Sequence, residues 1–144
     1  MRFRILQRSG YESKHNLNCW NQKEYIGFGL AAHSYENAVR FCNTNKMEEY
    51  ILVVQDSDDL SYKIIQEKQN KLEQEKEYMM LGFRKIEGIH INEFKNKFVD
   101  NPLYLFRKEL NSLVEKDLIT IDGDNIKLTN KGIDFANLVF EEFV

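Results

Sequence analysis

Cysteine and proline are scarce in this 144-residue chain, which contains two cysteines and a single proline. Cys19 and Cys42 cannot supply the four thiolates of an ordinary cubane iron–sulfur cluster, nor a closely spaced set of three cysteines. The Cys-x-x-Cys spacing of many metal and redox sites is absent as well. In a cytosolic protein both thiols are expected to be reduced. Cysteine chemistry therefore does not define a metal cluster here.

Long hydrophobic runs and an excess of positive charge are also missing. No segment reaches the roughly 18 consecutive apolar residues of a membrane-spanning helix, so no membrane span is expected. Charged residues interrupt the apolar ones in Met1–Arg8, which therefore does not resemble a secretory signal. The default expectation is a cytoplasmic location. The net charge of −3 argues against general nucleic-acid binding, because such proteins are usually basic.

The first part of the chain, residues 1–62, predicts short elements joined by turns. Tyr25–Leu30 is typical of a short strand that enters a glycine-containing loop. Val39–Phe41 predicts a second strand. The polar residues that follow can cap a short helix over Met47–Val54. This part should therefore be an irregular mixture of strands and a helix.

From about residue 63 onward the pattern indicates helices. Residues 62–84 are rich in Lys, Glu and Gln and predict one long helix. Its buried face should contain Leu72, Met79, Met80 and Phe83. Asn92 can cap a shorter helix, in which Phe94 and Phe98 are four residues apart and share one face.

The rest of the chain predicts a third helix, a hairpin and a last helix. Asn101-Pro102 is a strong helix start, with a capping side chain followed by proline. Asp122-Gly123 predicts the turn of a hairpin, and Thr129 can cap the final helix. Three helices, a two-stranded wing and a helix are the order of a winged-helix domain. The predicted fold class is α+β, with a winged-helix-like domain over residues 63–144.

A stand-alone winged-helix module that binds DNA or another protein is the alternative function. Many winged helices place their third helix in the major groove, where cations must meet phosphates. Here Glu109 and Glu115 accompany Arg107 and Lys108, and the wing tip at residues 122–125 contains two aspartates. The charge pattern therefore argues against a nucleic-acid partner. It favours a module that packs against other protein.

Two neighbouring segments carry a resemblance to a known family. Ser9–Trp20 and Tyr25–Tyr35 resemble the "GYESKHNLNYW…YIGFGLGAHSY" stretch of HemW-type heme chaperones. These proteins are radical-SAM relatives of oxygen-independent coproporphyrinogen III oxidase. Glu77–Arg84 is similar to that family's "EEFMMLGLR" helix, and residues 128–143 are similar to its closing domain. The chain is thus identified as the C-terminal part of such a protein.

The chain departs from the family pattern in ways that bear on activity. The Cys-x-x-x-Cys-x-x-Cys motif, which holds the 4Fe-4S cluster used with S-adenosylmethionine, is absent. The resemblance therefore implies that residues 1–62 are a remnant of the end of the radical-SAM barrel. Strands cut from a barrel leave unpaired edges, so a homodimer through these edges is expected.

The resemblance also suggests which residues contact a cofactor. In the family, a His-Asn-x-x-Tyr-Trp segment is linked to heme binding, and it falls on His15, Asn16 and Trp20, with Cys19 in the place of tyrosine. His15 would be the ligand of the heme iron, since neutral imidazole is a common axial ligand. A structural role for His15, tying backbone groups together, is the alternative. His33, in the second segment, is a weaker candidate.

The predicted function follows from these points. The chain should contribute to heme or tetrapyrrole binding and pack on the missing radical-SAM barrel, without being catalytic alone. S-adenosylmethionine and the 4Fe-4S cluster would belong only to a full-length protein.

Overall fold

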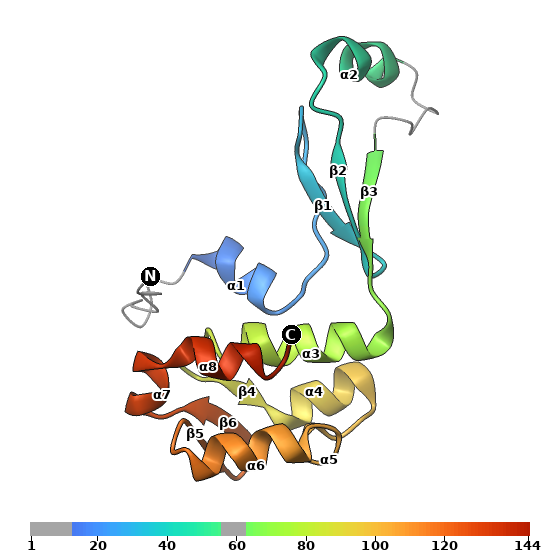
Figure 1. Ribbon diagram of the computed structural model, residues 1–144. Coiled ribbons are helices and arrows are strands. Elements are labelled where there is room, and N and C mark those ends of the chain that lie inside the picture. Colours follow the sequence, from blue (N-terminus) through green and yellow to red (C-terminus); the bar gives the residue numbers. More distant parts are fainter. Residues whose placement is uncertain (1–12, 56–62) are drawn as a thin grey trace. The chain divides into compact units, whose positions relative to one another are not determined.

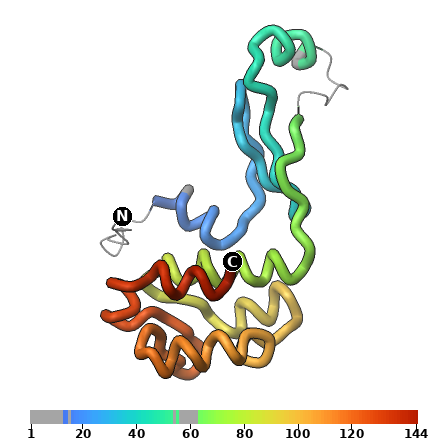
Figure 2. Tube along the Cα trace, in the orientation of Figure 1, coloured from blue at the N-terminus to red at the C-terminus, as the bar shows by residue number. Residues whose placement is uncertain are grey.

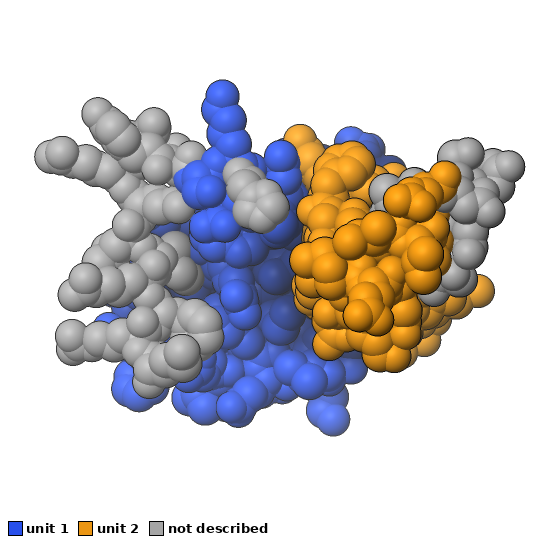
Figure 3. Space-filling model, turned by 90° about the horizontal axis from the view of Figure 1, so that it is seen from above, with its two compact units in different colours: residues 1–21, 75–144 blue, residues 22–74 orange. Residues whose placement is uncertain are grey.

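Figure 1 shows the computed structural model of the chain, which describes residues 13–55 and 63–144, apart from the side chains of His15 and Val54. The chain divides into two compact units. Unit 1 consists of residues 1–21 and 75–144, and unit 2 consists of residues 22–74; Figure 3 colours them separately. The first unit is therefore discontinuous in sequence, and the second interrupts it.

Unit 1 combines helices with one small antiparallel sheet. Its helices are α1 (Lys14–Trp20), α3 (Lys71–Gly82, which begins in the last residues of unit 2), α4 (Ile91–Phe98), α5 (Pro102–Leu105), α6 (Arg107–Glu115), α7 (Asn130–Asp134) and α8 (Ala136–Glu141). Its strands β4 (Ile89–His90), β5 (Ile119–Asp122) and β6 (Asn125–Leu128) are ordered β4-β6-β5. From α3 onward, the predicted order of three helical segments, a wing and a closing helical segment is present, and the α+β class is confirmed.

The prediction of one helix over residues 62–84 was wrong for its first part. Lys63–Lys68 form strand β3, and α3 begins only at Lys71. The helix start is fixed by a reciprocal capping pair: the Glu73 backbone N–H donates to Asn70 Oδ1 (3.0 Å), and the Asn70 N–H donates to Glu73 Oε2 (2.7 Å). Adjacent β-branched Ile64 and Ile65 favour the strand before it.

The start of α4 depends on the wing rather than on Asn92, which was the predicted cap. His90 is the N-cap residue and gives no side-chain cap. Asp124, in the wing turn, accepts hydrogen bonds instead, from the Ile91 N–H to its carbonyl oxygen (2.8 Å) and from the Asn92 N–H to its Oδ1 (2.9 Å). A carboxylate at a helix N-terminus is favourable because the exposed N–H groups carry partial positive charge. The acidic wing tip thus has a structural role.

The third and last helices are each divided in two. Asn101 caps α5 as predicted, accepting from the Leu103 N–H, with Pro102 at the first helical position. The backbone then leaves helical geometry at Phe106 (φ −110°, ψ 30°) before α6 begins. Phe135, with φ −113° and ψ 30°, separates α7 from α8 in the same way. Ile133, in α7, is 50% exposed.

One hydrophobic core holds unit 1 together. It contains Tyr78, Met79 and Phe83 from the end of α3 together with apolar side chains from α4, α5–α6, the wing and α8. Six contacts between aromatic rings join these elements, with ring centroids 4.8 to 6.4 Å apart. Met79 is fully buried and Met80 packs against the same core, so both methionines serve helix packing. Leu72, expected on this face, is 48% exposed.

Unit 2 contains a three-stranded antiparallel sheet and one helix. Its elements are β1 (His33–Glu36), β2 (Val39–Asn43), α2 (Met47–Val54) and β3 (Lys63–Lys68), and the strand order is β1-β2-β3. The strand at Val39 and the helix over Met47–Val54 were predicted. Tyr25–Leu30, predicted as a strand, makes only an isolated bridge from Tyr25 to Tyr35. In Figure 2 the tube runs through these elements in blue to green.

Hydrogen bonds, rather than a large apolar core, organise the described part of unit 2. Its buried hydrophobic residues are Tyr35 and Phe41, whereas Gln22, Ser34, Asn43, Thr44 and Gln69 are buried polar residues. Several large apolar side chains are exposed, including Phe28 (91%), Leu52 (70%) and Ile65 (72%). Burial of so little apolar surface provides little stabilisation for this unit by itself.

The predicted division into a barrel remnant, residues 1–62, and a closing domain, residues 63–144, stays a prediction. In the structure the boundaries between the compact units fall between residues 21 and 22 and between residues 74 and 75 of the sequence. Strand β3 belongs to the sheet of unit 2. Within the described residues, no helix is both long enough and apolar enough to cross a membrane.

Candidate functional site

The first candidate site is helix α1, which carries four of the five predicted cofactor residues. Ser13 caps it, accepting a hydrogen bond from the Asn16 N–H at 3.4 Å, and the Asn21 N–H closes it on Leu17 O at 2.9 Å. Positions 15, 16, 19 and 20 form one stripe, because residues four apart in a helix are neighbours. The helix therefore brings the backbone positions of the His-Asn-x-x-Cys-Trp segment together on one side.

The exposure of these side chains fits a surface contact. Asn16 is exposed, and Cys19 and Trp20 are partly buried. The side chain of His15 lies outside the described part of the chain, so its predicted role as an iron ligand rests on the sequence. Trp20 and Cys19 present a partly accessible apolar and polarisable surface on the same helix.

The C-terminal end of α1 is attached to the rest of unit 1 by two lysines. Lys85 Nζ donates to Asn21 Oδ1 at 2.8 Å, and Lys97 Nζ donates to Asn21 O at 3.4 Å. Lys97 also lies over the rings of Tyr78 and Phe98. Cations at this end of a helix are favourable because its carbonyl groups carry partial negative charge. Sequence analysis missed this attachment, because the partners are 64 and 76 residues apart.

Burial lowers the pKa of Lys85 from its ordinary value of 10.5, an effect that Glu93 and Glu87 partly oppose. The folded state therefore binds fewer protons than the unfolded state between the lowered pKa and 10.5, and the free energy of unfolding should rise with pH in that interval. We expect Lys85→Met to remove this rise.

Urea unfolding at a series of pH values below 10 measures the effect. Above that pH, Tyr78 contributes with the opposite sign, because burial raises its pKa from 10.0. Lys108→Met, at an exposed position of α6, is the control and should keep the wild-type pH dependence. The same slope in Lys85→Met as in the wild type would contradict the prediction.

His33, the fifth predicted residue, lies in β1 of unit 2. Its imidazole is exposed, and Nδ1 is 3.2 Å from Gln66 Oε1 in β3. The backbone around it is held closely: a Cβ on Gly27 would overlap the carbonyl oxygen of His33. The five predicted residues thus divide between α1 in unit 1 and β1 in unit 2.

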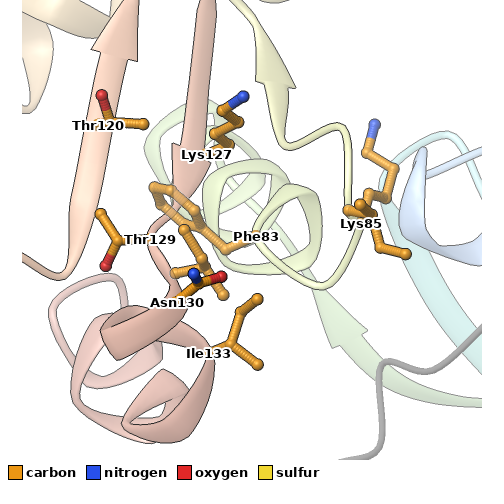
Figure 4. A pocket seen from close by; sticks show the side chains of 9 residues that line it. Phe83, Lys85, Thr120, Lys127, Thr129, Asn130 and Ile133 are labelled. Atoms are coloured by element: carbon orange, nitrogen blue, oxygen red, sulfur yellow. The ribbon is translucent and has the colours of Figure 1, made fainter.

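A cavity of about 360 Å³ lies elsewhere in unit 1, beside the end of α3, the wing and α7 (Figure 4). Its lining residues are Phe83, Lys85, Ile86, Thr120, Lys127, Leu128, Thr129, Asn130 and Ile133. The Thr129 hydroxyl already donates to Asp117 O at 2.7 Å and accepts from the Gly132 N–H at 2.9 Å. None of the five predicted residues lines this cavity. Within the described residues, no group of three or more His, Cys, Asp or Glu side chains could hold a metal ion.

Comparison with known proteins defines the class of the chain. Residues 69–135 match the family described as the HemN C-terminal domain. The fold resembles that in a structure of coproporphyrinogen III oxidase (HemN) from Escherichia coli, a radical-SAM enzyme, with a TM-score of 0.63 and 14% identity; the match covers 84% of this chain and 28% of that one. This likeness concerns the fold.

The more specific relatives are heme chaperones. The chain is 31% identical to heme chaperone HemW of Lactococcus lactis over 94% of its own length and 34% identical to that of Bacillus subtilis over 95%. It spans only 35% and 36% of these relatives, about a third of their length. The chain corresponds to the C-terminal part of a HemW-like protein, as the sequence resemblance predicted.

Proposed function

We propose that this chain contributes to heme or tetrapyrrole binding within a HemW-like protein and is not catalytic alone. The observation that supports the proposal best is its similarity, along nearly its whole length, to heme chaperones. Helix α1 adds a chemical reason, because it groups a histidine, an asparagine, a cysteine and a tryptophan on one stripe. Imidazole can ligate heme iron, and an indole can cover part of a flat macrocycle.

We further propose that unit 2 packs on a radical-SAM barrel. The supporting observation is its set of exposed apolar side chains in the loop before β1, in α2 and in β3, which are Ile26, Phe28, Leu30, Met47, Ile51, Leu52, Ile64 and Ile65. Apolar surface on this scale usually marks a contact with other protein. S-adenosylmethionine and a 4Fe-4S cluster would be held by that barrel. A homodimer, as the sequence predicted, would use the outer edge of β3, with which no described strand pairs.

Titration of the full chain with hemin tests the binding proposal. We expect a shift of the heme Soret band on binding, and we expect His15→Ala to weaken the binding by more than tenfold. That estimate follows because removing even an outer partner of a metal ligand costs roughly 10- to 100-fold in affinity.

The matched control is His90→Ala, which removes the histidine at the N-cap of α4, outside the candidate site. It should bind hemin as the wild type does. Circular dichroism confirms that each variant is folded. No Soret shift with the wild-type chain, or equal binding by His15→Ala and the wild type, would contradict the assignment of His15.

A further inference from the structure

The sheet of unit 2 holds His33 in an arrangement that its sequence position does not reveal. His33 in β1 faces Cys42 in β2, and Cys42 faces Ile64 in β3. Residues directly opposite in antiparallel strands project from the same side of a sheet. The contact from His33 Nδ1 to Gln66 Oε1, at 3.2 Å, therefore joins β1 to β3 across the strand between them.

The small side chain of Cys42 makes this crossing possible. Neighbouring strands are about 4.8 Å apart, so β1 and β3 are separated by about twice that distance. An imidazole and a glutamine side chain span it together only if the residue between them is small. The Asn43 N–H donates to Ala32 O, so His33 and Cys42 form the adjacent pair without mutual hydrogen bonds, in which side chains lie closest.

A β-bulge supplies the glutamine. The register between β2 and β3 pairs Phe41 with Ile65 but Arg40 with Glu67, which leaves Gln66 as the extra residue of β3. Bulges redirect side chains and are over-represented next to functional sites. Here the bulge places the Gln66 side chain where it meets the imidazole.

The hydrogen bond determines which ring nitrogen is available. In the tautomer that carries its proton on Nδ1, His33 donates to Gln66 Oε1, because a carbonyl oxygen can only accept. In neutral imidazole, Nε2 then has a free lone pair, and in the described part of the chain it meets no hydrogen-bond partner. A donated Nδ1–H with an open Nε2 is the usual arrangement of a metal-ligating histidine and its supporting partner.

We propose that His33 is an axial ligand for the iron of a metal tetrapyrrole through Nε2, with Gln66 as the residue that positions its ring. The inference rests on the proposed function and concerns unit 2 alone, independently of the ligand expected in α1. A tetrapyrrole fits better than a bare metal ion. The described residues offer no set of three ligands, as a closed zinc site needs. Iron in a macrocycle already has four nitrogen ligands and requires only an axial one.

The surface next to His33 suits a flat apolar ligand. Cys42 is partly buried and behaves as a small apolar residue, and Ile64, beyond it on the same side, is 50% exposed. Gly27, whose Cβ would overlap the carbonyl oxygen of His33, keeps the neighbouring backbone close to β1. The strand that carries the ligand is therefore fixed on that side.

Hemin titration in a His15→Ala background tests the inference. We expect His15→Ala to retain a residual Soret shift and the His15→Ala/His33→Ala double variant to lose it. Gln66→Leu in the same background should weaken the residual binding about tenfold, as loss of an outer partner of a metal-ligating histidine does. His90→Ala in the same background should change it less than about twofold, because this histidine lies in β4 of unit 1 and outside the proposed site.

The possible outcomes separate the two proposals. If wild-type chain shifts the Soret band but His15→Ala does not, the assignment of His33 is overturned while the heme role of α1 stands. If the double variant keeps the shift, His33 is not the ligand. If the wild type gives no shift, both proposals fail. His33→Gln, which keeps a polar side chain at this exposed position, repeats the test should the alanine variant lose its circular dichroism signal.

Discussion

Replacing Phe94 with alanine should lower the free energy of unfolding by about 3–5 kcal/mol, the usual cost of truncating a buried phenylalanine. The side chain is fully buried in the core of unit 1. Its ring contacts those of Tyr78, Phe98 and Phe106, with centroids 5.6, 4.8 and 6.4 Å away. The substitution removes these contacts and leaves a cavity between α3, α4 and α5. Since domains are commonly stable by only about 5–15 kcal/mol, the loss is a large fraction of the total.

Urea denaturation followed by circular dichroism measures this change. Tyr104→Ala is the matched control, because Tyr104 is an aromatic residue of the neighbouring helix α5 but is 79% exposed. It should change the free energy of unfolding by about 0.5 kcal/mol or less. Equal effects of the two substitutions would mean that the aromatic cluster does not hold unit 1 together.

Gly132→Ala should destabilise unit 1 by about 3 kcal/mol, although alanine normally stabilises a helix relative to glycine by about 1 kcal/mol. Gly132 lies in α7, where a Cβ would overlap the carbonyl oxygen of Leu118. The Thr129 N–H donates to that same oxygen at 3.0 Å. The Thr129 hydroxyl donates to Asp117 O and Lys131 Nζ donates to Lys116 O, each at 2.7 Å. Because backbone meets backbone here, α7 cannot move away without breaking these bonds.

Thermal unfolding compares this variant with Asp134→Ala, which introduces the same residue at an exposed position of α7. The control should be neutral or slightly stabilising. A Gly132→Ala variant that is more stable than the wild type would contradict the close approach of α7 to Leu118.

Local signals in the sequence predicted much of unit 1. Asn101-Pro102, the Asp122-Gly123 turn and Thr129 each act within a few residues, and each has its predicted role. Asn70 and Glu73 were an equally local signal for the start of α3, which the lysine- and glutamate-rich composition of residues 62–84 concealed. The capping of α4 by Asp124 depends on a residue 32 positions away, which periodicity cannot show.

The candidate sites divide in the same way. The stripe on α1 could be predicted because helix geometry relates residues four apart. The partner of His33 could not, since Gln66 is 33 residues further along and reaches the imidazole only through a bulge and across a strand. The two lysines that bind Asn21 are likewise far from it in sequence, so the composition of the chain could not predict their role.

The two ends of unit 2 are joined to each other, and this affects how readily the unit can tolerate insertions and deletions. Gln22 is its first residue and Gln74 its last, and Gln22 Nε2 donates to Gln74 O at 2.9 Å. This hydrogen bond thus already joins the two ends of the 53-residue segment. The entropy of closing such a loop changes by only about 0.6 kcal/mol when its length doubles. Insertions and deletions within residues 22–74 should therefore change the stability of unit 1 only slightly. The sheet of unit 2 is thus free to diverge in length and sequence while the helical core of unit 1 stays the same.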